Sequence, residues 1–87
     1  TGIHADHPHV GGITGGVGLD AEGHQGGDVI DRLGHGTAVA AAIRDQAPAC
    51  ELLAVKVFDR RLTTTAAALV SGITWAVEAR AHFINLS

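Results

Sequence analysis

The sequence predicts a small α/β domain in which parallel strands alternate with helices. Its second half holds two helix-type segments, each followed by a short apolar run of strand length, and the connections between them are short. A strand that rejoins its sheet after a helix runs parallel to its predecessor through a right-handed crossover. The 87 residues allow one small domain or a part of a larger one.

The first 36 residues are rich in glycine and histidine, with eleven of the twelve glycines and five of the six histidines. Apolar residues scattered among these glycines between Val10 and Leu19 predict a short strand or hairpin with sharp turns. The polar run from Asp20 to Asp28 that follows predicts a surface loop.

From Thr37 onward the pattern becomes regular. An Ala-rich run predicts a helix that Gly36 or Thr37 caps, that ends at about Asp45 and that Pro48 prevents from continuing. The segment Leu52–Phe58 is almost continuously apolar and contains β-branched residues. That composition predicts a strand covered on both faces.

A second helix is predicted from about Thr65 to Ala81. Its apolar residues recur at steps of three and four and predict one apolar stripe, made of Ala66, Leu69, Val70, Ile73, Ala76 and Val77. Residues 83–86 (Phe-Ile-Asn-Leu) predict a second buried strand after this helix.

Composition narrows the function classes. Hydrophobic residues make up 46% and charged residues 17%, which indicates a packed chain rather than a disordered one. The net charge of −3 provides no basic field, so we expect no nucleic-acid partner. No apolar run approaches the ~18 residues of a membrane span, and we expect no membrane partner. The single cysteine, Cys50, is interpreted as a partly buried small residue.

His35 is the strongest candidate for chemistry, because it lies between glycines at a predicted helix entrance. An imidazole titrates near neutral pH and can take a proton from a hydroxyl nucleophile, then return it to a leaving group. That role needs a carboxylate on one ring nitrogen. Asp28 and Asp31 are near in sequence, but spacing alone aims neither of them at the ring. A plain surface histidine is the alternative interpretation.

The densest cluster of potential metal ligands contains His4, Asp6, His7 and His9. Imidazole and carboxylate groups suit zinc or another divalent transition metal. Pro8 bends this segment, however, and no second ligand group with familiar spacing follows. We therefore favour a polar loop and predict no metal ligand. An α/β metal-binding domain built on His4, His7 and His9 stays as an alternative.

Taken together, the motifs of the chain resemble those of the subtilisin-like serine proteases, the subtilases. The run Gly34–Ala40 resembles the family's Gly-His-Gly-Thr-His-Val-Ala, with Ala38 in place of the second histidine. The matches run from end to end in the family's order: Thr1–Ile3, His7–His9, Gly34–Ala40, Ala47–Pro48, Leu53–Val57, Gly72–Ala76 and Ile84–Ser87.

The resemblance implies hydrolysis of peptide bonds in a peptide or protein substrate through attack by a serine hydroxyl and an acyl-enzyme. It implies that His35 is the general base. The segment Leu62, Thr63 and Thr64 would pair with the substrate backbone, and Ser87 would begin the wall of the pocket for the residue before the scissile bond.

The resemblance also implies that residues 1–87 are a partial catalytic domain, an incomplete three-layer parallel sheet with flanking helices. The triad aspartate would immediately precede Thr1, and the oxyanion-hole asparagine and the nucleophilic serine would follow Ser87. We therefore expect the chain alone to be inactive and to need the remainder of the domain to complete its fold.

Two further expectations follow from the resemblance. His9 stands in place of an aspartate that binds calcium in many members, so we expect no cofactor. A non-catalytic subtilase-like module that binds peptides without cutting them is the second alternative function.

Overall fold

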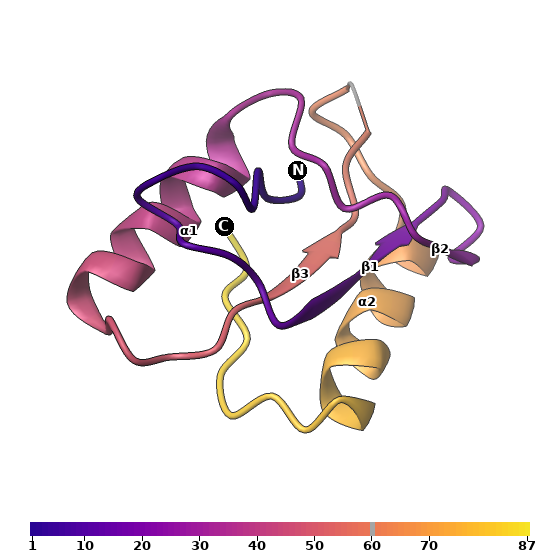
Figure 1. Ribbon diagram of the computed structural model, residues 1–87. Helices are drawn as coiled ribbons and strands as arrows, with labels where there is room; N and C mark the ends of the chain where they lie inside the picture. The colour runs from indigo at the N-terminus through magenta and orange to yellow at the C-terminus, as the bar shows by residue number, and fades with distance from the viewer. Residues whose placement is uncertain (60) are drawn as a thin grey trace.

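The computed structural model describes residues 1–59 and 61–87. Two helices and a small sheet make up the fold (Figure 1). The elements in chain order are β1 (Gly15–Leu19), β2 (Gln25–Gly26), α1 (His35–Gln46), β3 (Leu53–Lys56) and α2 (Ala66–Glu78). None of these helices is both long and apolar enough to cross a membrane.

The three strands form a mixed sheet in the order β2-β1-β3. β1 pairs with β3 in parallel, from Gly15 opposite Leu53 to Gly18 opposite Lys56. β1 pairs with β2 antiparallel, because the chain reverses in the turn that begins at Asp20. The α/β class and the parallel pair joined through a helix are as predicted. The prediction of an all-parallel, three-layer sheet is wrong for this chain, since the glycine-rich region forms a hairpin at one edge.

The predicted strand at residues 83–86 is absent from the part of the chain that the structure describes. After α2 the backbone turns through Arg80, and the segment then runs past the sheet without joining it (Figure 1). Phe83 is 95% exposed. An apolar run forms a strand only where a free sheet edge receives its backbone hydrogen bonds, and composition does not report whether such an edge is within reach.

The face of α2 that packs on the sheet consists of small residues, Ala68, Gly72 and Ala76. A Cβ at Gly72 would lie 3.0 Å from Val55, so the helix approaches β3 as closely as a glycine allows. The larger residues of the predicted apolar stripe are half-exposed or exposed: Leu69, Val70, Ile73 and Val77. Of that stripe the chain buries only Ala76, and the other two buried positions of α2 are Ala68 and Gly72.

The hydrophobic core cluster involves α1 rather than α2. Val10, Ala40 and Leu52 are buried there together. Arg44 holds the surrounding loops, because its Nε donates to the Val10 carbonyl at 2.8 Å and its guanidinium also bonds the Gly12 and Cys50 carbonyls. The guanidinium of Arg44 therefore ties the core-facing loops to the helix.

Candidate functional site

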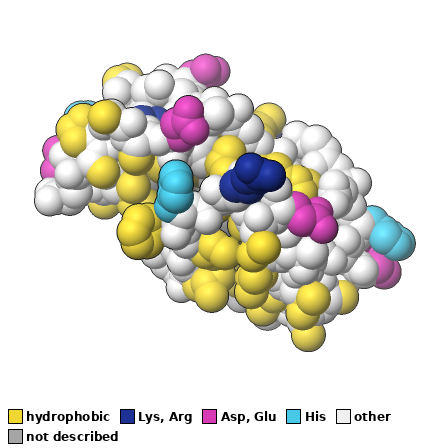
Figure 2. All heavy atoms as spheres, turned by 90° about the horizontal axis from the view of Figure 1, so that it is seen from below, with side chains coloured by type: hydrophobic (Ala, Val, Ile, Leu, Met, Phe, Trp, Pro, Cys, Tyr) yellow, Lys and Arg dark blue, Asp and Glu magenta, His cyan; other side chains and the backbone are white. Residues whose placement is uncertain are grey.

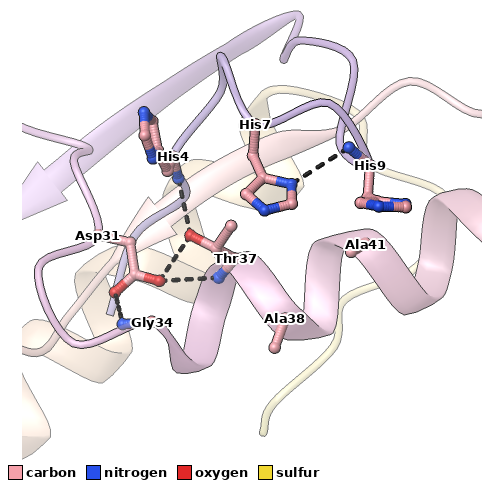
Figure 3. Close-up of a pocket in the computed structure, with 8 residues that line it drawn as sticks. All are labelled: His4, His7, His9, Asp31, Gly34, Thr37, Ala38 and Ala41. Carbon is pink, nitrogen blue, oxygen red and sulfur yellow. Dashed lines mark hydrogen bonds between the residues drawn. The ribbon is translucent and has the colours of Figure 1, made fainter.

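His35 is the first residue of α1, two residues earlier than the predicted start. Gly34 precedes it with a φ of 94°, in the left-handed region that glycine adopts without strain. The acceptor for the first turn is the carboxylate of Asp31, which takes hydrogen bonds from the backbone nitrogens of Gly34 and Thr37 at 2.9 and 2.8 Å (Figure 3). The prediction that Gly36 or Thr37 caps this helix is wrong, because a carboxylate outside the helix supplies the cap.

The Asp31 carboxylate also accepts a hydrogen bond of 2.6 Å from the Thr37 hydroxyl. Burial raises the pKa of Asp31, but the hydrogen bonds from Thr37, Gly34 and Leu33 outweigh burial and hold that pKa well below its usual range. Asp31 therefore stays ionised at the positive end of the α1 dipole, where a negative charge is stabilising. Its oxygens accept hydrogen bonds from the N-terminus of α1 and not from the imidazole of His35.

The Asp28 carboxylate serves other groups as well. It lies 2.8 Å from the Arg32 guanidinium and accepts from the backbone nitrogen of Ile30 at 3.1 Å. The Arg32 hydrogen bond, followed by that of Ile30, lowers the pKa of Asp28 to about 2. In the described residues neither Asp28 nor Asp31 is hydrogen-bonded to His35. Neither carboxylate therefore orients the His35 ring; both instead form hydrogen bonds within the loop before α1.

The N-terminal residues lie across the first turn of α1. The Thr1 hydroxyl accepts from the backbone nitrogen of Gly36 at 2.8 Å, and the backbone nitrogen of His4 donates to the Thr37 hydroxyl at 2.9 Å. A Cβ at Gly36 would overlap the carbonyl oxygen of Gly2, so this close approach requires glycine at position 36. These contacts hold Thr1 beside His35.

His35 borders a small hollow of about 210 Å³. The hollow brings together three residues that the sequence singled out, His35, Leu62 and Ser87, although they are far apart along the chain. Thr1 and Phe58 complete its lining. All three singled-out residues are exposed to solvent.

Two of the residues predicted to contact substrate do not line this hollow. Thr63 is exposed, and the Thr64 hydroxyl donates to the carbonyl of Val57 at 2.5 Å. Sequence reasoning missed Phe58 as a lining residue. The only signal for it in the sequence is its position at the end of the apolar run Leu52–Phe58.

A second hollow, of about 440 Å³, lies between α1 and the histidine-rich loop (Figure 3). α1 contributes two small side chains to its lining, those of Ala38 and Ala41. Its lining residues are His4, His7, His9, Asp31, Gly34, Thr37, Ala38 and Ala41.

The three histidines of this hollow do not converge on one point. The Nδ1 atom of His7 accepts from the backbone nitrogen of His9 at 3.1 Å, which uses that lone pair and leaves the ring proton on Nε2 when His7 is neutral. The ring of His4 points away from those of His7 and His9 (Figure 3). This arrangement does not fit a metal centre built on His4, His7 and His9.

A different group of potential ligands lies on the hairpin turn. Among the described residues, only Asp20, Glu22 and His24 bring three ligand atoms within 4.8 Å of one another. All three are exposed, and Asp20 already accepts from the backbone nitrogens of Glu22 and His24. The carboxylate thus closes the turn between β1 and β2.

Fold and hollow together define an α/β chain with a solvent-accessible histidine at a helix entrance, beside Leu62 and Ser87. No family model matches the chain, and no solved structure matches it. Two curated proteins do. A thermostable alkaline protease of Halalkalibacterium halodurans is 41% identical over 66 residues, covering 66% of this chain and 18% of the relative. A subtilisin-like protease of Coccidioides posadasii is 48% identical over 52 residues, covering 55% of this chain and 13% of the relative.

These relatives confirm the resemblance of the chain to the subtilisin-like proteases. The chain spans less than a fifth of the length of either relative, 18% and 13% respectively. The similarity therefore concerns one segment of those proteins.

Proposed function

We propose that the chain is part of the catalytic domain of a serine endopeptidase and that His35 is its general base. The observation that supports this most directly is the shared hollow, in which His35 lies with Leu62 and Ser87. By the resemblance these residues are the base and two substrate contacts. Both relatives are named as proteases, which also supports hydrolysis of peptide bonds.

In this proposal the exposed imidazole of His35 takes the proton of a serine hydroxyl and then gives it to the leaving amine. The peptide substrate runs along Leu62–Thr64 and reaches Ser87. The orienting carboxylate comes from the residue that precedes Thr1 in the whole protein. Docking of Thr1 on the first turn of α1 supports this, because Thr1 lies next to His35 in the lining of the hollow and the preceding residue is bonded directly to it.

The serine and the oxyanion-hole donor come from the polypeptide after Ser87. The exposed apolar surface supports the presence of such further chain, because a stable monomer rarely leaves so many large apolar side chains uncovered. Viewed from below, hydrophobic side chains gather over the face that α2 and the C-terminal segment form (Figure 2). The exposed members are Leu69, Val70, Ile73, Val77, Phe83, Ile84 and Leu86.

The test uses the full-length polypeptide that contains this chain and a fluorogenic peptide. Replacing the base, His35→Ala, is expected to lower kcat by about 10⁴- to 10⁶-fold, the size of loss that removal of a triad member causes in subtilisin itself. The matched control is His82→Ala, since His82 is an exposed histidine outside the hollow. Full activity in His35→Ala, or an equal loss in both variants, would refute the proposed role of His35.

Two further outcomes separate the alternatives. The 87-residue chain alone is expected to hydrolyse no peptide, because by the resemblance it carries one member of the triad. A full-length protein that binds peptide but hydrolyses none would instead identify a non-catalytic binding module. Isothermal titration with an uncleaved peptide, carried out beside the activity assay, distinguishes the two.

A further inference from the structure

Lys56, the last residue of β3, is a buried cation with no part in the hollow. Its side chain is 7% exposed. The ammonium donates to the carbonyl oxygen of Ile30 at 2.8 Å and lies 3.4 Å from the Asp28 carboxylate. Burying a lysine is costly unless the charge is paired and hydrogen-bonded, and here both partners belong to the loop before α1.

The loop that Lys56 holds is the one that sets the start of α1. Ile30 is followed directly by Asp31, whose carboxylate binds the backbone nitrogens on both sides of His35, those of Gly34 and Thr37. The carbonyl that Lys56 binds thus belongs to the residue directly before Asp31, whose side chain caps the N-terminus of α1.

Two other contacts also hold this loop in place. On one side a Cβ at Gly18 of β1 would overlap the carbonyl oxygen of Asp28, so the loop lies directly on the sheet. On the other side the Val29 carbonyl accepts from the backbone nitrogen of Ile3 at 2.8 Å. Lys56 joins the loop to β3, through its contacts with the Ile30 carbonyl and the Asp28 carboxylate.

We propose that Lys56 is a positioning residue for His35: by fixing Ile30 and Asp28 it fixes Asp31, and Asp31 fixes the first turn of α1. This inference rests on the proposed role of His35 as a base. Misplacing a catalytic group by about 1 Å costs roughly 100-fold in rate, so a residue that never touches substrate can still set kcat.

A structural role alone would make Lys56 equivalent to Arg44. Both cations reach across the fold to backbone carbonyls, but Arg44 binds those of Val10 and Gly12, away from the His35 end of α1. Arg44→Met is therefore the matched control. It removes a cation that is hydrogen-bonded to backbone carbonyls without touching the loop that carries Asp31.

The experiment compares Lys56→Met, Lys56→Arg and Arg44→Met in the full-length protein. For Lys56→Met we expect kcat to fall about 10- to 100-fold while KM changes less than about threefold, because the loop shifts and the substrate segment does not. Lys56→Arg should restore most of kcat, since a guanidinium can bond both the Ile30 carbonyl and the Asp28 carboxylate. Arg44→Met should lower Tm and leave kcat near the wild-type value.

A second readout does not depend on peptidase activity. The imidazole NMR signals of His35 should move in Lys56→Met and stay in place in Arg44→Met. If the full-length protein proves not to be a peptidase, this measurement still decides whether Lys56 positions His35. Unmoved His35 signals in Lys56→Met, or equal losses of kcat in Lys56→Met and Arg44→Met at equal Tm, would overturn the inference.

Should Lys56→Met fail to fold, Asp28→Asn replaces it. The Asp28 side chain is 53% exposed, so the substitution is tolerable, and it removes one of the two partners of Lys56. We expect the same movement of the His35 signals and a smaller fall in kcat, about two- to fivefold. Wild-type signals and kcat in a folded Asp28→Asn variant would count against the inference.

Discussion

The first turn of α1 and the outer face of α2 differ in how far the chain itself satisfies them: the first is hydrogen-bonded within the chain, and the second stays exposed to solvent. At the first turn of α1, backbone nitrogens donate to Thr1 and Asp31, and the Thr37 hydroxyl donates to Asp31 while it accepts from the backbone nitrogen of His4. At the outer face of α2, Val70 and Val77 are more than 60% exposed. At the entrance of α1 the backbone nitrogens of Gly34, Gly36 and Thr37 all have acceptors within the chain, whereas α2 keeps an apolar face that the chain does not cover.

The difference follows from the kind of interaction each region uses. A hydrogen bond needs one donor and one acceptor at the right distance, and short segments such as residues 1–4 and 28–37 provide them. Burial of apolar surface needs a large opposing surface, because its contribution grows with the area removed from water. Residues 1–87 thus suffice to order the entrance of α1 but not to cover α2.

The largest effect on this comparison is expected from Gly36→Ala. A methyl group there would overlap Gly2, so docking of the N-terminal residues should be lost at a cost of about 2–3 kcal/mol in the free energy of unfolding. Urea denaturation measures this. The control is Gly27→Ala, where a Cβ would have no heavy atom within 4 Å. Equal stabilities of the two variants would mean that residues 1–4 do not pack on α1.

An intermediate effect is expected from Asp31→Ala, which removes the cap of α1 and leaves the Thr37 hydroxyl without its acceptor. We expect a loss of about 1–3 kcal/mol in the free energy of unfolding. The matched control is Asp6→Ala, because Asp6 is exposed. Melting temperatures that are indistinguishable for the two variants would show that Asp31 does not cap the helix.

The same carboxylate predicts a pH dependence of stability. Folding lowers the pKa of Asp31, so its stabilisation is complete above the unfolded pKa of about 3.9 and is lost as the pH falls from there toward the lower folded value. The stability difference between wild type and Asp31→Asn should therefore shrink on acidification below about pH 4. A difference that stays constant or grows in acid would contradict this assignment.

The smallest effect on stability is expected at the outer face of α2. The double variant Val70→Lys/Val77→Lys should change the free energy of unfolding by less than about 0.5 kcal/mol, since both side chains are exposed. It should reduce self-association of the 87-residue chain in analytical ultracentrifugation, whereas Thr74→Lys, at another exposed position of α2, should not. A loss above about 2 kcal/mol would mean that these valines are packed within the chain.

Periodicity and propensity predicted the class of fold and the existence of both helices, because Ala-rich and amphipathic segments report their own local preference. The Gly-His-Gly-Thr motif identified His35 as the candidate base before any geometry was known. The motif did not report which side chains share a hollow: of Leu62, Thr63 and Thr64, which the resemblance assigned to substrate, only Leu62 lines the hollow beside His35. A motif names a segment, and side-chain direction depends on how that segment packs.

The sequence by itself determined the alternation of helices and strands and the resemblance to subtilisin-like proteases, since both are written in local order. Tertiary structure alone decided that Asp31 and not Gly36 or Thr37 caps α1, because the acceptor is chosen by how the loop folds back. It also decided that residues 83–86 form no strand, since a strand depends on a partner edge elsewhere in the chain. The meeting of His35, Leu62 and Ser87 in one hollow belongs to the same category, because only folding brings such distant positions together.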